Sequence, residues 1–397
     1  MIELARRVKQ VKPSATLSIT AKAASLRAEG KDIISLSVGE PDFETPVHAK
    51  RAAAAAIESG LTRYTPVAGI PELRQAISDK LKKDNGLDYE PANVLVSTGG
   101  KQCIYNLMQA ILNSNDEVII PAPFWVSYPD MALLAGGRPV IVQTRADADF
   151  KLTPEQLAAV MNSSTRLLVL NSPSNPTGMA YSREEFAALG EVLKEHPRVT
   201  VISDEMYEKI LFDGKAFASF AAASPHLRER TITVGGVSKA YCMTGWRIGY
   251  AAGPSHVIKA MSTVQSQSTS NPCSISQHAA LAALTGPQDE LLDMVRTYEQ
   301  RRDWLVARLN GMTGFDCLRP DGAFYVFPGI QELLAKASFK DDVAFCDWLL
   351  DEAGVALVPG TAFGAPSHVR FSYAVSQDTL AEACKRIEGA IDRRTLD

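Results

Sequence analysis

The sequence of 397 residues predicts an α/β fold whose large domain contains a mostly parallel sheet of seven strands. Between about residues 70 and 290, short apolar runs alternate with helix-forming segments, a pattern typical of strands joined by helical crossovers. The runs are apolar at successive positions, so helices are expected to cover both faces of the sheet. In such folds, binding sites collect beyond the carboxyl ends of the strands.

The first 45 residues are expected to form an N-terminal arm that joins the smaller domain. A helix over 13–28 and a short strand over 33–36 lead into a loop shaped by Gly39 and Pro41. The helix predicted over 47–59 contains a run of alanines, which are the strongest helix formers.

Residues 46–295 are expected to form the large domain. Its predicted strands are 94–98, 117–120, 139–142, 167–170, 199–203, 231–234 and 248–252. The predicted helices between them include 102–111, 125–134, 154–161 and 183–194. Parallel pairing of these strands would bring their carboxyl ends to one edge.

A long amphipathic stretch over 289–310 leads to a smaller α/β domain, predicted for residues 296–397. Its predicted strands are 323–327, 355–358 and 368–373, and a final helix is predicted over 379–392.

Composition indicates an ordinary globular protein, with 46% hydrophobic and 22% charged residues. The net charge of -4 argues against nucleic-acid or membrane partners. The six cysteines are scattered, with no spacing typical of a metal site. The start of the chain lacks the apolar core of a signal peptide, and no window is apolar enough to span a bilayer. A cytoplasmic enzyme is therefore expected.

The segment 237–250 carries the strongest chemical signal. Lys239 follows a predicted buried strand and stands among glycines and small polar residues. Partial burial makes an amine lose its proton more easily, so it can attack a carbonyl as a Schiff-base nucleophile. The glycines let the backbone approach an anion, which Arg247 could hold. The alternative is a surface lysine in a glycine-containing loop.

The whole segment resembles the cofactor-lysine segment of class I pyridoxal-phosphate aminotransferases, which have the fold-type I architecture. In that family the equivalent lysine is linked covalently to pyridoxal 5'-phosphate, and the arginine eight residues later meets its phosphate. The resemblance implies these roles for Lys239 and Arg247. Many relatives have a serine where this chain has Gly236, so Ser238 and the backbone are expected to serve instead.

Two further segments match the family. At 98–102, glycines between a strand and a helix free N–H groups to face a phosphate, and the family's phosphate loop implies this role for Gly100 and Lys101. Trp125 could simply belong to the core, but the aromatic residue at the matching position in the family stacks on the pyridine ring.

Polar residues follow two other predicted strands. The turn-rich segment 171–178 could be an ordinary loop, yet the resemblance makes Asn175 a donor to the cofactor's phenolic oxygen and to the substrate carboxylate. Asp204 ends a buried strand, where a carboxylate needs a partner such as a protonated pyridine nitrogen. Glu205 is a weaker alternative. The resemblance implies that Tyr207 binds the phenolic oxygen.

Three residues complete the match. Arg370 lies in a predicted strand, where arginines are usually solvated, but the family places its α-carboxylate arginine there. Gly39 would contact the same carboxylate through its backbone. In relatives the residue equivalent to Tyr64 reaches the phosphate across a dimer interface, which implies a homodimer with shared active sites.

The resemblance is strongest to bacterial aspartate aminotransferases. It implies transfer of the amino group of L-aspartate, or a similar amino acid, to 2-oxoglutarate, giving oxaloacetate and L-glutamate. The partners would be small amino acids and 2-oxo acids. Alternatives are an aromatic or prephenate aminotransferase of the same fold, or a ligand sensor; the sensor would need a DNA-binding module, and no basic N-terminal extension is present.

The distal carboxylate of an acidic substrate needs a cation. Many aspartate aminotransferases use an arginine from the stretch equivalent to 262–271, which here holds neither arginine nor lysine. Lys101 is the candidate, because the chain resembles a bacterial subgroup in which this lysine, helped by Thr16 and a serine of the partner chain, meets that carboxylate. The alternative is that Lys101 only neutralises the cofactor phosphate.

Overall fold

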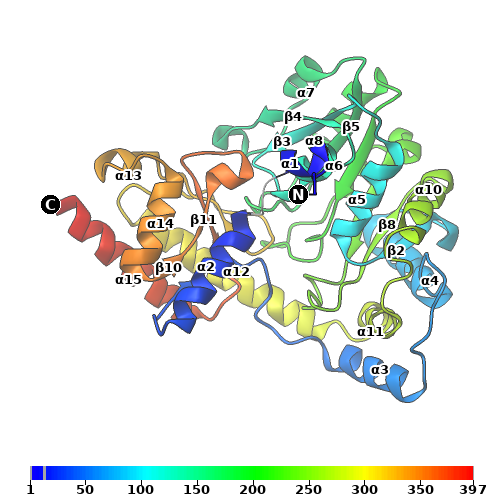
Figure 1. The fold of residues 1–397 in the computed structure, drawn as a ribbon, viewed down its shortest axis with the longest axis horizontal. Coiled ribbons are helices and arrows are strands. Elements are labelled where there is room, and N and C mark those ends of the chain that lie inside the picture. Colours follow the sequence, from blue (N-terminus) through cyan, green and yellow to red (C-terminus); the bar gives the residue numbers. More distant parts are fainter. Residues whose placement is uncertain (1, 12–14, 397) are drawn as a thin grey trace.

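A seven-stranded sheet forms the centre of the larger part of the molecule (Figure 1). The computed structural model describes residues 2–11 and 15–396. Across the sheet the strands are β2 (Val94–Ser97), β8 (Gly249–Ala252), β7 (Thr231–Gly236), β6 (Thr200–Asp204), β5 (Thr165–Asn171), β3 (Glu117–Ala122) and β4 (Arg138–Gln143). All pairs from β7 to β4 are parallel, and β8 runs antiparallel to both its neighbours. The predicted mostly parallel sheet is confirmed.

Helices cover both faces of this sheet, as the continuous apolar strands require. The helices of this part are α3 (Val47–Glu58), α4 (Pro71–Lys80), α5 (Gly100–Ile111), α6 (Ser127–Leu134), α7 (Pro154–Val160), α8 (Arg183–Lys194), α9 (Phe220–Ala223), α10 (Ser255–Ser266) and α11 (Ser274–Thr285). One core cluster joins the sheet to Leu107 of α5 and Met261 of α10. A second core cluster joins other side chains of the strands to Phe186 and Leu189 of α8.

Local sequence explains where several of these helices begin. Ser182 caps α8 by accepting a hydrogen bond from the N–H of Glu185, whose side chain accepts one from the N–H of Ser182. Thr153 and Gln156 form the same capping box at α7, with a proline at the first helical position. The connections include one π-helical turn, η1 (Leu81–Asn85), and the 3-10 helices η2 (Pro91–Asn93), η3 (Ala146–Ala148), η4 (Pro225–Arg230) and η5 (Gly360–Phe363).

The C-terminal part lies beside the large sheet and is reached through the long helix α12 (Asp289–Asn310) (Figure 1). Its antiparallel sheet has the order β11 (Val358–Pro359), β12 (Val369–Ser372), β9 (Tyr325–Val326). The other elements of this part are α13 (Gln331–Lys336), α14 (Asp342–Ala353), β10 (Val355–Ala356) and α15 (Gln377–Leu396).

The N-terminal segment contains α1 (Arg6–Gln10), α2 (Ala15–Ala28) and β1 (Ile34–Ser35). β1 pairs in parallel with β10, so that Ile34 lies opposite Val355. This pairing ties the start of the chain to its C-terminal part. The domain boundaries at 45 and 295 stay predictions.

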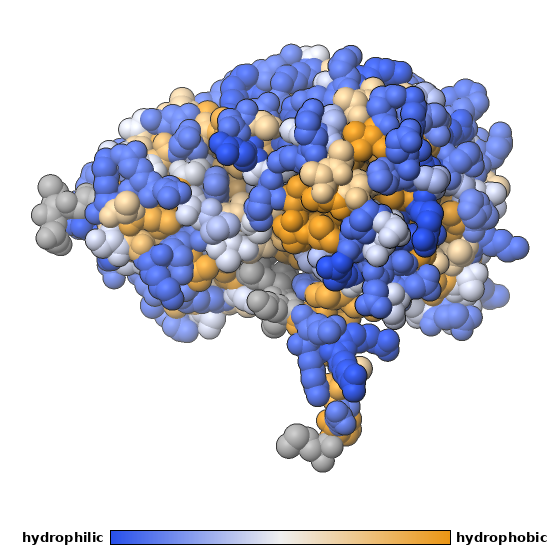
Figure 2. Space-filling view, turned by 90° about the horizontal axis from the view of Figure 1, so that it is seen from above, coloured by the Kyte–Doolittle hydropathy of each residue, from blue (hydrophilic) through white to orange (hydrophobic). Residues whose placement is uncertain are grey.

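The face shown in Figure 2 is largely hydrophilic, with hydrophobic side chains gathered in patches, the most prominent near its middle. Residues 2–10 are exposed and project from the body of the molecule. Among the described residues, no helix has the length and apolar character needed to cross a membrane.

Candidate active site

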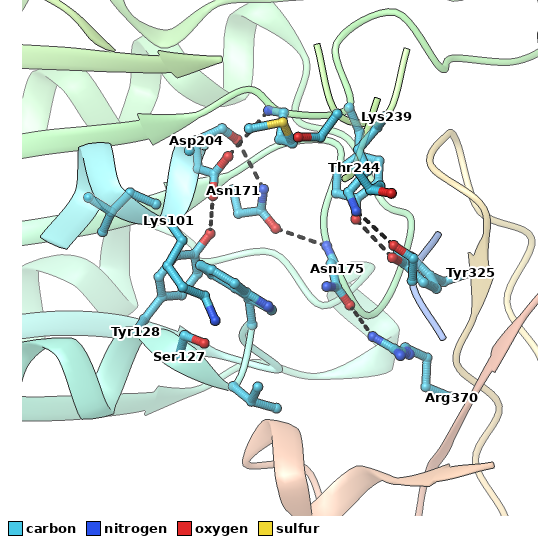
Figure 3. Close-up of a pocket in the computed structure, with 18 of the residues that line it drawn as sticks. Lys101, Ser127, Tyr128, Asn171, Asn175, Asp204, Lys239, Thr244, Tyr325 and Arg370 are labelled. Atoms are coloured by element: carbon cyan, nitrogen blue, oxygen red, sulfur yellow. Dashed lines mark hydrogen bonds between the residues drawn. The ribbon is translucent and has the colours of Figure 1, made fainter. Parts of the chain in front are cut away.

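A cavity of about 330 Å³ lies between the carboxyl edge of the large sheet and the C-terminal part. All but one of the residues predicted for the site line it: Gly39, Gly100, Lys101, Trp125, Asn175, Asp204, Tyr207, Ser238, Lys239, Arg247 and Arg370. They come from segments spread over most of the chain, and Figure 3 shows the labelled ones facing one another. The parallel register explains the convergence, because Asn171 and Asp204 are paired where β5 and β6 end.

Lys239 lies in the loop after β7, at the inner wall of the cavity. Its Nζ donates a 2.7 Å hydrogen bond to the carbonyl oxygen of Gly39. Burial lowers the pKa of Lys239 to about 8, partly opposed by Glu40. In the described part of the chain, Lys239 forms no ion pair. The free amine is therefore accessible near neutral pH, as a nucleophile or a base requires.

Asp204 ends β6 and presents its carboxylate to the cavity, with only 6% of the residue exposed. Oδ2 accepts a 2.6 Å hydrogen bond from the hydroxyl of Tyr128, and Oδ1 accepts a 3.2 Å hydrogen bond from the N–H of Met206. Burial raises the pKa of Asp204 to about 6. A buried carboxylate held by neutral donors suits a cationic partner entering the cavity.

Glu205, the weaker alternative, does not line the cavity. Its carboxylate accepts hydrogen bonds from Ser203, Ser219 and Asn85. The strand alternates its side chains between two sides, so the residue after Asp204 points away from the cavity.

The amino end of α5 provides an anion cradle. Gly99 precedes the helix at φ 84°, a conformation that favours glycine. A Cβ at Gly99 would lie 2.5 Å from Nη2 of Arg247, so the guanidinium packs against this turn. Arg247 donates a 2.8 Å hydrogen bond to the carbonyl oxygen of Thr244. Helix N–H groups and a guanidinium together suit a phosphate.

Ser238 is buried and lines the cavity. At Gly236, a Cβ would lie 3.1 Å from the carbonyl oxygen of Ile248, which leaves little room for a larger side chain.

Arg370 of β12 is 2% exposed and reaches the cavity from the C-terminal part. Its Nη1 donates to Oδ1 of Asn175 over 2.8 Å, and its Nη2 donates to the carbonyl oxygen of Ser37 over 2.6 Å. Its Nε is buried without a partner among the described residues. A buried guanidinium that contacts only neutral groups is suited to bind an incoming carboxylate.

Two pairs of aromatic residues frame the cavity. Trp125 packs edge-to-face on Tyr128, with ring centroids 5.3 Å apart, and Nζ of Lys101 lies 5.0 Å from the Trp125 ring centroid. Tyr207 shares a 2.8 Å hydrogen bond with the hydroxyl of Tyr325.

The pKa of Lys101 is lowered, first by partial burial and then by nearby Arg247.

Tyr64 is the exception, because it is 92% exposed and does not line the cavity of its own chain. The side chain of Thr16 lies outside the described residues. Sequence reasoning missed other lining residues, among them Ser127, Tyr128, Asn171, Thr244 and Tyr325. Asn171 could have been found, since it follows a predicted strand, whereas no pattern marks Tyr325.

Known proteins resemble this chain over nearly its whole length. The model of the family described as aminotransferase class I and II matches residues 31–387. The chain is 55% identical over 384 residues to an aspartate/prephenate aminotransferase of Cereibacter sphaeroides, covering 96% of each chain. It is 48% identical to the aspartate aminotransferase of Bacillus subtilis, covering 99% of this chain and 100% of that one. The crystal structure of the aspartate aminotransferase from Rhizobium meliloti superposes with a TM-score of 0.96 at 48% identity, covering 99% and 100% of the two chains.

Proposed function

Because the chain belongs to the class I and II aminotransferase family, we propose that it transfers the amino group of L-aspartate to 2-oxoglutarate, giving oxaloacetate and L-glutamate. The family depends on pyridoxal 5'-phosphate, and so does this enzyme. One observation carries the proposal: an amine, a buried carboxylate and a buried guanidinium, from Lys239, Asp204 and Arg370, line one cavity.

The residues of the cavity fit the cofactor. Within the part of the chain that the structure describes, the buried carboxylate of Asp204 has no cationic hydrogen-bond partner, which matches a protonated ring nitrogen. The turn at Gly100 with Ser238 and Arg247 offers N–H, hydroxyl and guanidinium donors, which match a phosphate. Trp125 offers a face on which the cofactor ring can stack. Asn175 and Tyr207 offer hydrogen-bond donors for the phenolic oxygen of the cofactor. When bound, pyridoxal 5'-phosphate supplies an electron sink that stabilises negative charge at the substrate Cα.

The chain itself supplies the acid–base chemistry. Lys239 would hold the cofactor covalently, and its Nζ would take the proton from the substrate Cα. Its lowered pKa keeps a useful fraction of the amine unprotonated. Asp204 is buried, so its carboxylate would favour the protonated form of the cofactor's ring nitrogen.

Substrate carboxylates are bound by separate groups. Arg370, whose Nε has no partner among the described residues, binds the α-carboxylate, together with Asn175 and the backbone of Gly39. Lys101 binds the distal carboxylate of an acidic substrate. This assignment is supported by the position of its ammonium at the cavity wall, with no ion pair among the described residues.

A second substrate class has support from a relative. The 55% identical protein of Cereibacter sphaeroides is named an aspartate/prephenate aminotransferase. Prephenate or an aromatic amino acid is therefore the alternative substrate of the same site.

We also propose a homodimer and a cytoplasmic location. The dimer is supported by Tyr64, which projects into solvent although its family role is to bind a phosphate. The location is supported by the six cysteines, all of them free thiols.

A steady-state screen of amino donors against 2-oxoglutarate tests the function. Aspartate is expected to give the highest kcat/KM, with the visible absorbance of bound cofactor present in the purified protein. A preference for an aromatic donor would select the alternative. So would efficient transfer from glutamate in a second assay with prephenate as the acceptor. The absence of transamination with every donor would refute the proposal.

A further inference from the structure

A buried polar cluster lies behind the turn that carries Asp204 and Tyr207. Asp204, Met206 and Tyr207 line the cavity, whereas Glu205 and Glu208 do not. The cluster consists of Lys80, Asn85, Ser203, Glu205, Glu208 and Ser219. Its side chains take no part in the chemistry proposed above. Buried charges contribute little to the stability of a protein. Stability alone therefore does not explain why these charged residues lie beside the site.

Asn85 lies at the centre of the cluster. Its Nδ2 donates to Oε2 of Glu205 over 2.9 Å and to Oε2 of Glu208 over 2.6 Å. Its Oδ1 accepts a 2.7 Å hydrogen bond from Nζ of Lys80, which also pairs with Glu208. Asn85 ends the π-helical turn η1, and Gly86 follows in the left-handed region at φ 69°. Such turns are rare and are often found at functional sites.

Glu205 connects this centre to the sheet. Its Oε1 accepts hydrogen bonds from Ser203 over 2.8 Å and from Ser219 over 2.6 Å. Its N–H donates to the carbonyl oxygen of Val234 in β7, over 2.8 Å. Hydrogen bonds therefore join Glu205 to β6, β7, η1 and Ser219, which precedes α9. Adjacent Cα atoms are about 3.8 Å apart across a stiff peptide bond, so a fixed Glu205 also fixes Asp204.

We propose that Glu205 is a positioning residue, which holds the turn from Asp204 to Tyr207 through its hydrogen bonds to Asn85, Ser203 and Ser219. The proposal rests on the proposed function, in which Asp204 and Tyr207 contact the cofactor ring. Glu205 itself touches neither cofactor nor substrate.

Hydrogen bonding, rather than charge, performs this role. Burial raises the pKa of Glu205 to about 7, and the neighbouring Glu208 acts in the same direction, while Ser219, Ser203 and Lys80 oppose it. The neutral carboxyl is therefore already accessible near neutral pH. A glutamine can make the same contacts, because its oxygen accepts from Asn85 and its amide donates to serine hydroxyls, which rotate to accept.

The test uses the purified holoenzyme and two variants, Glu205→Ala and Glu205→Gln. The measurements are the midpoint of the pH titration of the visible cofactor absorbance and the cofactor retained after gel filtration. Glu205→Ala is expected to shift the midpoint by at least about half a pH unit and to lose cofactor. Glu205→Gln is expected to keep the wild-type values.

Glu117→Ala is the matched control. Glu117 is another buried glutamate, 4% exposed, but it begins β3 at the far end of the sheet, where Arg138 and Asn162 hold it. Both alanine variants are expected to lower the melting temperature, and only Glu205→Ala is expected to move the titration midpoint. A purely structural role would affect the melting temperature alone.

An unshifted midpoint in Glu205→Ala would overturn the proposal, as would an equal shift in Glu117→Ala or in Glu205→Gln. If Glu205→Ala does not fold, Ser219→Ala removes one donor to the carboxylate and undergoes the same measurement, with the same outcomes. Failure of the proposed function is distinguishable, because it would show in the wild-type protein as absent cofactor absorbance and absent transamination.

Discussion

The hydroxyl of Tyr128 donates a 2.6 Å hydrogen bond to Oδ2 of Asp204, which joins the first turn of α6 to the end of β6. Two neutral donors, this hydroxyl and the N–H of Met206, hold the carboxylate in place. Neither neutralises it. The charge thus remains available to a cation that enters the cavity.

Asp204→Asn removes that charge and keeps the size of the side chain. Turnover is expected to fall by about 100- to 1,000-fold, because the electron sink of the cofactor weakens, while the fold and much of the cofactor binding persist. Asp204→Glu is expected to be milder. Steady-state kinetics check this, with Asp147→Asn, an exposed aspartate paired with Arg145, as control. An unimpaired Asp204→Asn enzyme would reject the role.

Lys239→Ala is expected to lose the pH-sensitive visible absorbance of the bound cofactor and nearly all turnover, because the covalent link and the base are the same amine. Spectra and single-turnover assays of the purified variant check this. Lys209→Ala is the control, since Lys209 pairs with Asp84 outside the cavity. Transamination by Lys239→Ala at a rate comparable to wild type would contradict the assignment.

Asp213 predicts a pH-dependent contribution to stability. Hydrogen bonds from Arg302 and Arg319 lower the pKa of Asp213 to about 2, against about 3.9 in the unfolded chain. A folded pKa below the unfolded one gives stability that is fully present above pH ~4 and is lost as pH falls towards about 2.

Asp213→Asn is therefore expected to lower the free energy of unfolding at pH 7 by at most about 2 kcal/mol, because the carboxylate is partly solvated. The difference from wild type is expected to shrink between about pH 4 and pH 2, as the native carboxylate takes up its proton. Urea unfolding at several pH values measures it. A difference that stays constant down to pH 2 would show that the ion pairs are not its cause.

Tyr64 is expected to act across a dimer. Sedimentation at assay concentration should give a dimer, and Tyr64→Ala should weaken cofactor retention. Mixing Tyr64→Ala with Lys239→Ala subunits separates the two possibilities: action across the interface leaves one intact site in each mixed dimer, and action within one chain leaves none. An active monomer would refute the assignment.

Lys101→Ala distinguishes the two roles of this lysine. Loss of a distal-carboxylate contact is expected to raise KM for aspartate and glutamate by about 10-fold or more, and to spare uncharged or aromatic donors. Loss of a phosphate contact would weaken cofactor retention and affect every donor alike. A uniform loss across donors would therefore end the specificity assignment.

Some helices could not be predicted from the sequence. Serine, threonine and valine give α10 a weak helix propensity, and no helix was expected there. The fold stabilises it through Gln265, which is fully buried and hydrogen-bonds to Ser97, Asn106 and the backbone of Val96. Tertiary packing overrides local preference in such segments.

The seven strands of the sheet and the chemical groups at their ends could be predicted from local patterns in the sequence. Apolar runs and strand-end residues such as Lys239 and Asp204 are local patterns, and parallel strands bring their carboxyl ends to one edge. The folded chain was needed to show that Asp204 faces the cavity while Glu205 faces Asn85. It was also needed to show which distant residues meet, as Arg370 meets Asn175. The reason is physical: such contacts depend on how separately formed elements pack, and spacing along the chain does not encode that packing.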